Sequence, residues 1–186
     1  IKQLTQQYQE IFTDLPGNCK LQSHEIELTS ETPVRCRQYE VPYAMQESLK
    51  MELKKMQEMG VIRGSTSAFA SPVVVVKKRD STDRVCIDYR ALNKKTVFDP
   101  QPVTPPADLF QRMRNDRYFS ALDLAKGYWQ IPMRQQDIHK TAFITMDSHY
   151  ECLRMPFGLR NACATMTRAL KKLVGDMKQV VVYVDD

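Results

Sequence analysis

The 186-residue chain has 42% hydrophobic and 26% charged residues, which is typical of folded globular domains and excludes disorder along the whole chain. No apolar run approaches the roughly 20 residues that a membrane helix needs, so we expect no membrane span and no membrane partner. Lys and Arg outnumber Asp and Glu by 27 to 22, and the resulting net charge of +5 favours polyanionic partners without requiring them.

The start of the chain and its cysteines indicate whether it is part of a longer protein and in which redox compartment it occurs. It starts at Ile1 and shows no signal-peptide pattern, so we expect it to be a piece of a longer protein. Its five cysteines are odd in number and contain no Cys-x-x-Cys pair, while its three histidines are scattered. This pattern favours reduced cysteines in an intracellular, cytoplasmic protein without a zinc site.

The first part of the chain predicts helices followed by a β-hairpin. Apolar residues at helical spacing predict a short leading helix that ends at the breaker sequence of residues 15–18, and alternation predicts a half-buried strand at residues 23–28. One apolar stripe predicts a helix over residues 45–59, ended by Gly60. Strands are then predicted at residues 73–76 and 84–89, joined by a charged tip.

A proline-rich stretch at residues 100–106 predicts a hinge between two lobes, residues 1–103 and residues 104–186. Thr104 is expected to cap a helix that runs to Met113. The second lobe then predicts strands at residues 118–123, 141–146, 150–154 and 180–184, and a helix at residues 162–174. Because this order has no regular βαβ repeat, we expect an α+β fold with helices on one face of an antiparallel sheet.

Carboxylates follow two of the predicted strands. Asp123 ends one of them, and Asp185 and Asp186 follow the last. Three acids that converge would repel one another unless cations neutralise them, and Mg²⁺ is the cation that suits carboxylate oxygens and phosphate. Two such ions, about 3.5 to 4 Å apart, can activate an attacking oxygen and stabilise a leaving one. Taken alone, either acid is more simply explained as a strand-end or turn residue.

Positive charge is concentrated in the predicted hairpin and just after it. Residues 77–95 contain seven basic and three acidic residues, which gives +4 of the total +5. Such a segment opposite a carboxylate cluster suits a nucleoside triphosphate, whose anionic oxygens need Arg or Lys on one side and metal on the other. Taken alone, the segment is more simply explained as a solvated turn.

Several ordered motifs resemble the reverse transcriptases of LTR retroelements, most closely the Ty3/gypsy type. They are DLAKGY at residues 123–128, RMPFGLRNA at 154–162 and YVDD at 183–186, with SPV at 71–73, RVCIDYRALN at 84–93 and KTAF at 140–143. The resemblance implies a right-hand polymerase, with fingers in residues 1–103 and an incomplete palm in residues 104–186. It implies an RNA-directed DNA polymerase that acts on dNTPs and on an RNA or DNA template with its primer.

The resemblance also implies roles for particular residues at the metal site. Asp123, Asp185 and Asp186 would be the catalytic, metal-binding carboxylates, and the carbonyl of Leu124 an accessory ligand. The metal would be two Mg²⁺ ions, with Mn²⁺ as a substitute. The metal would lower the pKa of the primer 3′-hydroxyl, which attacks the α-phosphate while pyrophosphate leaves.

Further residues are implied to bind the incoming dNTP. Lys78 and Arg84 would hold the triphosphate, with Lys77 able to replace Lys78. Tyr128 would lie beneath the sugar and leave no room for a 2′-hydroxyl, although a plain core tyrosine beside Trp129 is the simpler alternative. The backbone N–H groups of Lys126 and Gly127 would contact phosphate or the sugar 3′-hydroxyl.

The turn that contains Phe157 would pass near the nucleotide and template. Many vertebrate retroviral relatives carry Gln where Phe157 stands, so a hydrogen-bonding role does not transfer to it. Cys163 stands where the family usually has Pro, and Met166 and Thr167 replace its usual Phe-Gln. These differences leave the metal ligands unchanged.

The chain stops at the second Asp of YVDD, so the resemblance implies that thumb, connection and RNase H segments follow in a Pol polyprotein. It also implies that this polyprotein can occur in virus-like particles. We therefore expect the fragment alone to be weakly active or inactive. A nucleic-acid-binding module without catalysis is the main alternative, and a metal-dependent phosphohydrolase that uses the same carboxylates is a third.

Overall fold

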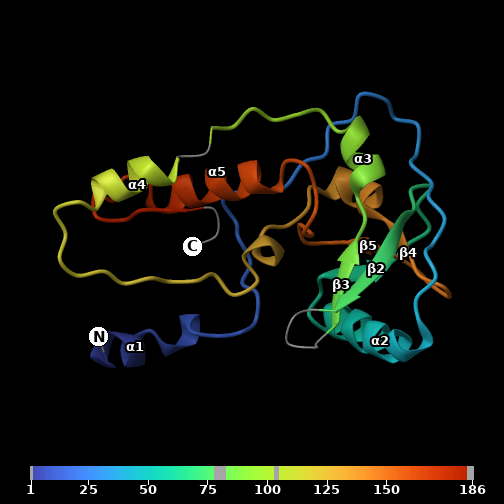
Figure 1. Cartoon of the computed structure of the whole chain (residues 1–186), viewed down its shortest axis with the longest axis horizontal. Coiled ribbons are helices and arrows are strands. Elements are labelled where there is room, and N and C mark those ends of the chain that lie inside the picture. Colours follow the sequence, from blue (N-terminus) through green and yellow to red (C-terminus); the bar gives the residue numbers. More distant parts are fainter. Residues whose placement is uncertain (1, 78–82, 103–104, 184–186) are drawn as a thin grey trace.

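The computed structural model describes residues 2–77, 83–102 and 105–183. A five-stranded sheet with α2 and α3 occupies one end of the molecule in the view of Figure 1, and α4 and α5 lie towards the other end. The N-terminal residues form α1 (Lys2–Gln7) and the 3-10 turn η1 (Gln9–Ile11), which confirms the predicted short leading helix.

Helix α2 (Tyr43–Glu58) follows from one apolar stripe, as predicted. Leu49, Leu53 and Met56 are buried on that stripe, and the helix contacts the two edge strands of the sheet, β1 and β3. Gly60 ends the helical segment with a φ of 64°, a left-handed conformation that glycine adopts without a steric penalty. The helix therefore covers one face of the sheet and buries its apolar stripe there.

The sheet has the order β1-β5-β4-β2-β3. Its strands are β1 (Ile62–Gly64), β2 (Ser71–Lys77), β3 (Asp83–Ile87), β4 (Phe143–Ile144) and β5 (His149–Cys152). The predicted hairpin is confirmed, since β2 pairs with β3 antiparallel from Val73 opposite Ile87 to Lys77 opposite Asp83. The α+β class is confirmed as well, but the sheet is mixed, because β2 pairs with β4 in parallel.

Helix α5 (Ala162–Val174) has the predicted bounds and is buried along one side. Its side chains Met166 and Leu170 join a core with Ile26, Leu92 and Ile131. A second core lies between α2 and the sheet. Shorter helical segments line the first core or connect to it: α3 (Arg90–Lys95), α4 (Pro106–Arg112), η2 (Gly127–Gln130) and η3 (Gln135–Thr141).

Two predicted strands are wrong at every described position, one is reduced to isolated bridges, and one is reduced to two residues. Residues 118–123 form no strand and are exposed, with 95% of Tyr118 accessible, and residues 180–183 are irregular. Residues 23–28 form only isolated bridges, and of residues 141–146 only Phe143 and Ile144 are paired. An apolar pattern yields a strand only where a neighbouring strand accepts its hydrogen bonds, and no described residue pairs with 118–123 or 180–183.

The proline-rich stretch predicted as a hinge ends at the start of helix α4, which begins at Pro106 with Pro105 before it. Proline suits this position because the first helical N–H groups have no intrahelical partner. Thr104, the predicted cap, and the predicted boundary between residues 103 and 104 lie outside the described residues. Within the described part of the chain, no helix has the length and apolar character required to cross a membrane.

Candidate active site

The turn of residues 156–158 is fixed against α3. The carbonyl of Gly158 accepts a hydrogen bond from the Asn93 side chain at 2.7 Å, and the Asn93 side chain accepts one from the Arg160 N–H at 2.9 Å. Gly158 has a φ of 92°, and a side chain there would also contact the Ile87 carbonyl. The contact would be an ordinary one at 3.6 Å, so it is the positive φ that favours glycine at this position.

This turn presents Phe157 between two residues that come from other segments. The guanidinium of Arg84, on β3, lies 5.7 Å from the centroid of the Phe157 ring. The Tyr128 ring, on η2, meets the Phe157 ring edge-on at a centroid distance of 4.8 Å and an angle of 70°. Three of the predicted dNTP-binding residues are thus in contact, although they are far apart in sequence.

Tyr128 is buried, with 8% of its surface accessible. Its hydroxyl lies 3.1 Å from the Cys163 sulfur, at the first turn of α5. The simpler alternative of a packed core tyrosine is therefore correct as a description of its surroundings. The ring nevertheless borders Phe157, which is 42% exposed, so the tyrosine lies directly behind an accessible surface.

Lys126 and Gly127 form the tight turn that leads into η2. Lys126 adopts a left-handed conformation with a φ of 50°, and the Gly127 N–H donates to the Leu124 carbonyl at 3.0 Å. The predicted contact of the Gly127 N–H with a nucleotide therefore competes with a bond inside the turn. The Lys126 ammonium lies 5.4 Å from the Trp129 ring centroid and 3.3 Å from the Met59 sulfur, so its side chain points towards the end of α2.

A hollow of about 360 Å³ adjoins these residues. Its walls are one side of α2, strand β3, Trp129, Phe143 and the 156–158 turn, and Arg84 and Phe157 lie at its border. Most of this lining is apolar, with Arg84 and Glu52 as its charged members. A space of this kind accommodates a flat ring beside an anionic group held by the arginine.

The predicted metal site is only partly within the described residues. Asp123 is exposed in the irregular segment before η2, and no described residue pairs with its carboxylate, while Leu124 is half-buried. Asp185, Asp186 and Lys78 lie outside the described residues. Among the described residues, no group of three or more His, Cys, Asp and Glu side chains gathers as a metal site would require. Asp123 supplies hard oxygen ligands of the type that Mg²⁺ prefers, which fits the predicted role.

Other perturbed groups lie outside this constellation. Burial lowers the pKa of His24 to about 4, and its imidazole Nδ1 lies 2.8 Å from the Thr165 hydroxyl. Hydrogen bonds from Arg90 lower the pKa of Asp88 to about 2. Thr165 and Arg90 are their respective hydrogen-bond partners, so both groups help to stabilise the framework.

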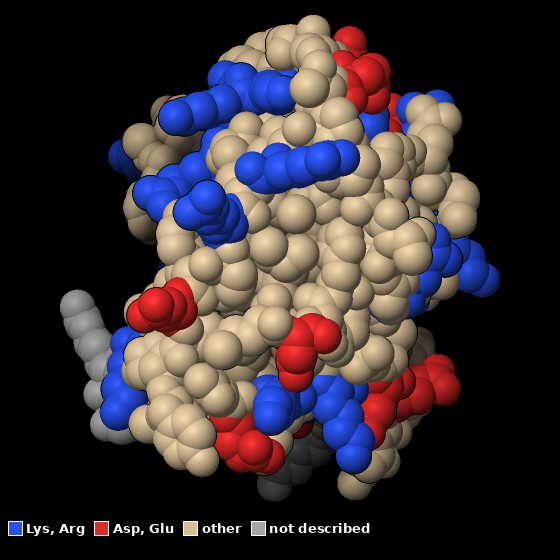
Figure 2. Space-filling view, turned by 90° about the vertical axis from the view of Figure 1, so that its right-hand side faces the viewer, with Lys and Arg blue, Asp and Glu red and all other residues tan. Residues whose placement is uncertain are grey.

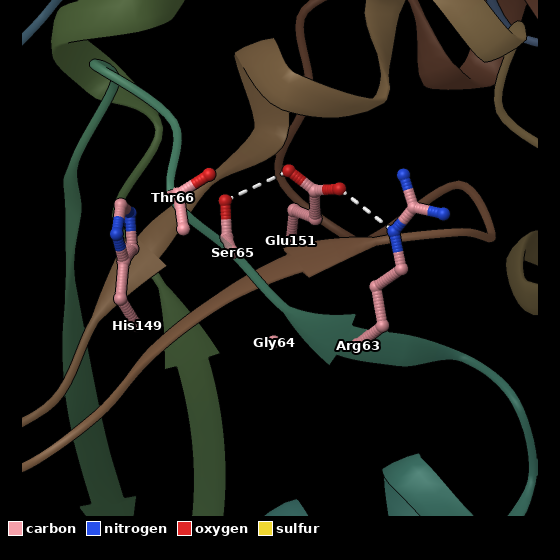
Figure 3. A pocket seen from close by; sticks show the side chains of 6 residues that line it. All are labelled: Arg63, Gly64, Ser65, Thr66, His149 and Glu151. Atoms are coloured by element: carbon pink, nitrogen blue, oxygen red, sulfur yellow. Dashed lines mark hydrogen bonds and ion pairs between the residues drawn. The ribbon is translucent and has the colours of Figure 1, made fainter.

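A second hollow, of about 530 Å³, lies at the end of β1 and contains none of the predicted site residues. Figure 3 shows the Glu151 carboxylate between its two partners, with Ser65 at 2.7 Å and the Arg63 Nε at 2.8 Å. Because Glu151 neutralises Arg63 there, the hollow carries no excess positive charge from this pair. It offers no argument for an anion site.

Two features of the site were not predicted from the sequence. One is the Cys163 contact with Tyr128, and the other is the pair of Asn93 hydrogen bonds that fixes the 156–158 turn. Both residues lie inside the recognised motifs or directly beside them, but their partners are 35 and 65 residues away in sequence. Only the tertiary structure brings these partners together.

Basic side chains are also visible away from the site. Figure 2 shows Lys and Arg gathering on the upper part of one face, at the height that α3 has in Figure 1, above a wide uncharged area. Helix α3 itself carries two basic residues, Lys94 and Lys95, in its last turn. A surface of this sign attracts phosphate-bearing polymers.

Comparison with known proteins identifies the family. A family profile described as "Reverse transcriptase (RNA-dependent DNA polymerase)" matches residues 76–186. The chain is 39% identical over 170 residues to the retrovirus-related Pol polyprotein from transposon 297 of Drosophila melanogaster, with 88% of this chain and 16% of that protein covered. It is 34% identical over 169 residues to the Pol polyprotein from transposon gypsy of the same species, with 87% and 16% covered.

A solved structure gives the same answer for the fold. The foamy viral protease-reverse transcriptase in complex with double-stranded DNA superposes on this chain with a TM-score of 0.89 and 25% identity. The match covers 98% of this chain and 33% of the foamy viral chain. The chain thus spans about one sixth of the length of the two Pol polyproteins. Motifs, fold and sequence similarity agree that the chain belongs to the reverse transcriptase family, as the reverse transcriptase domain of a gypsy-like LTR retrotransposon Pol polyprotein.

Proposed function

We propose that the chain forms the fingers and part of the palm of an RNA-directed DNA polymerase, which transfers nucleotides from dNTPs to a primer 3′-hydroxyl. One observation carries the proposal beyond family membership. Arg84 and Phe157 border one hollow and Tyr128 contacts the Phe157 ring, although these three residues, each implied to bind dNTP, come from separate segments. This convergence supports a common role for them.

The chemistry of these residues suits an incoming nucleotide. Arg84 presents a planar guanidinium with several N–H donors, which can hold triphosphate oxygens in a bidentate manner. Among the described residues, the guanidinium of Arg84 has the Phe157 ring beside it, at 5.7 Å from the ring centroid. Lys78 would add a second positive charge, and the Lys126 backbone would approach the sugar or phosphate. Catalysis of this type depends mostly on positioning and charge stabilisation.

The metal site would consist of Asp123, Asp185 and Asp186, with the Leu124 carbonyl as a further ligand. Two Mg²⁺ ions, or Mn²⁺ in their place, would lower the pKa of the primer hydroxyl and stabilise the leaving pyrophosphate. The Leu124 carbonyl already accepts the Gly127 N–H and retains a second lone pair for a cation. The Asp123 side chain is exposed, so a metal ion could reach its carboxylate.

The partners would be an RNA or DNA template with its primer, dNTPs, and the thumb, connection and RNase H segments of the same polyprotein. The similar foamy viral enzyme was solved with double-stranded DNA, which supports a duplex as the product held by this fold. The basic side chains around α3 supply the electrostatic attraction that such a duplex requires. We propose a cytoplasmic, intracellular setting, including virus-like particles.

Primer extension tests the proposal. The longest reading frame that contains this chain would be assayed with Mg²⁺, dNTPs and a primed RNA template, beside Asp123→Asn and the matched control Asp116→Asn, which changes an exposed aspartate in a turn. We expect extension by the wild type and the control, and a loss of at least about a hundredfold in Asp123→Asn. Nucleic-acid binding without extension would instead support a binding module, and template hydrolysis without synthesis a phosphohydrolase. The fragment alone is expected to extend weakly or not at all.

A further inference from the structure

We infer that Cys163 is a positioning residue for Tyr128 and sets how strongly the site prefers deoxyribonucleotides over ribonucleotides. The inference rests on the proposed polymerase function. It concerns a residue that lies outside the predicted metal-binding and nucleotide-binding sets, and it assigns the side chain a measurable effect on sugar selection.

The Tyr128 side chain is held at two separate places. Its hydroxyl lies 3.1 Å from the Cys163 sulfur, and the edge of one ring meets the face of the other in its contact with Phe157. A contact at the ring alone would still allow the hydroxyl end to swing, and a contact at the hydroxyl alone would allow the ring to rotate. Together the two contacts restrict both the tip and the plane of the ring.

The side chain of Cys163 is exposed, but its backbone is fixed by helix α5. It lies in the first turn of α5, and its neighbours Ala162, Ala164 and Thr165 are all buried in the core. A cysteine side chain has one rotatable bond before its sulfur, so the position of the sulfur follows closely from the position of the helix. The helix also contacts η2, the segment that carries Tyr128.

A ring that excludes a 2′-hydroxyl acts on a single oxygen atom, so small displacements of the ring change the selection. Misplacement of a group by about 1 Å can alter a rate by about a hundredfold. If the hydroxyl of Tyr128 loses its contact with the Cys163 sulfur, one restraint on the ring is removed, and a ribonucleotide meets less resistance. Incorporation of a deoxyribonucleotide, which does not press on the ring, changes less.

If Cys163 had a purely structural role, the effect of its substitution on the two nucleotides would be different. Loss of packing at α5 would lower the efficiency for both nucleotides by the same factor, and the ratio of the two efficiencies would stay constant. The ratio of kcat/KM for a dNTP to kcat/KM for the matching rNTP therefore separates positioning from packing.

The test measures this ratio with Mg²⁺ on one primer–template, in the longest reading frame that contains the chain. The variants are Cys163→Ala, Cys163→Ser, Tyr128→Phe and the Cys163→Ala/Tyr128→Phe double variant, with Cys36→Ala as a matched control at a half-buried cysteine elsewhere. We expect Cys163→Ala to lower the ratio about fivefold, which is the effect of losing one ordinary hydrogen bond. Cys163→Ser keeps a hydrogen-bonding atom and should retain the ratio, and the control should match the wild type.

The double variant tests the coupling. If Cys163 acts through the Tyr128 hydroxyl, adding Cys163→Ala to Tyr128→Phe should shift the ratio no further. An unchanged ratio in Cys163→Ala, or additive shifts in the double variant, would overturn the inference while leaving the polymerase proposal intact. Absence of extension by the wild type would overturn the polymerase proposal itself, and the inference with it.

Discussion

Acid should destabilise this fold through one buried histidine. His24 is 1% exposed, its backbone is hydrogen-bonded to the 132–134 segment, and its imidazole Nδ1 faces the Thr165 hydroxyl at 2.8 Å. Burial lowers its pKa from 6.5 to about 4, with Arg168 adding to this effect and Asp137 and Asp99 opposing it. The side chain is thus neutral in the folded protein at pH values where an unfolded chain would protonate it.

The sign and size of the effect follow from proton linkage. Between pH 6.5 and pH 4 the unfolded chain binds more protons at this position than the folded chain, so the stability falls as the pH falls through this window. Integrating from pH 7 to pH 4 over a pKa difference of this size gives a loss of about 3 kcal/mol. This is a large share of the roughly 5 to 15 kcal/mol that stabilises a typical domain.

Urea unfolding of the chain at pH 7, 5.5 and 4 would measure the effect. His24→Asn is the comparison variant, because an asparagine can place an amide near the Thr165 hydroxyl but does not titrate. Carboxylates titrate in both proteins, so the histidine contributes the difference, and the wild type should lose about 3 kcal/mol more than the variant between pH 7 and pH 4. A difference below about 1 kcal/mol would refute the reasoning, as would a His24 titration midpoint near 6.5 in an NMR experiment on the wild type.

Three further predictions concern the framework and the site. Lys140→Met leaves the Asp137 carboxylate buried without the ammonium that now lies 2.9 Å from it. The free energy of unfolding should therefore fall by about 3 to 5 kcal/mol. Urea unfolding that shows no loss would contradict the pairing. Asn93→Ala removes both hydrogen bonds to the turn that carries Phe157, and should cost about 1 to 3 kcal/mol in thermal unfolding. Arg84→Lys keeps the charge but loses the planar guanidinium, so KM for dNTP should rise about tenfold with a smaller change in kcat. An unchanged KM would show that Arg84 does not hold the triphosphate.

The elements that the sequence predicted well are those whose pattern is local. The stripe of α2, the bounds of α5 and the β2–β3 hairpin all follow from spacing within one segment. The strands predicted at residues 118–123 and 180–184 failed at every described position, because alternation and β-branched runs describe a surface that can pair but supply no neighbour for it. The parallel pairing of β2 with β4 was likewise unpredictable, since it joins segments about 70 residues apart.

The site shows the same division between local and tertiary information. Motif resemblance selected Arg84, Tyr128 and Phe157 one by one, and the structure brings them into contact through two special backbone positions, the left-handed Lys126 and the positive φ of Gly158. Neither conformation is visible in an apolar pattern. The proposed metal acids remain a prediction from sequence, with Asp123 exposed and Asp185 and Asp186 outside the described residues.

If Phe157 belongs to the proposed nucleotide site, its contact with Arg84 suggests a role for a phenylalanine at the position where the resemblance implies glutamine in many vertebrate retroviral relatives. A glutamine can accept a hydrogen bond from a guanidinium and would then occupy some of its donors. A phenylalanine ring attracts the cation through its π face and accepts no N–H in a conventional bond, so Phe157 itself occupies none of the donors of Arg84. The same ring supports Tyr128 from the other side, which couples the orientation of the proposed triphosphate ligand to that of the proposed sugar-selecting residue. A substitution at Phe157 should therefore change both KM for dNTP and the ratio of dNTP to rNTP use, whereas Arg84→Lys should change the first far more than the second.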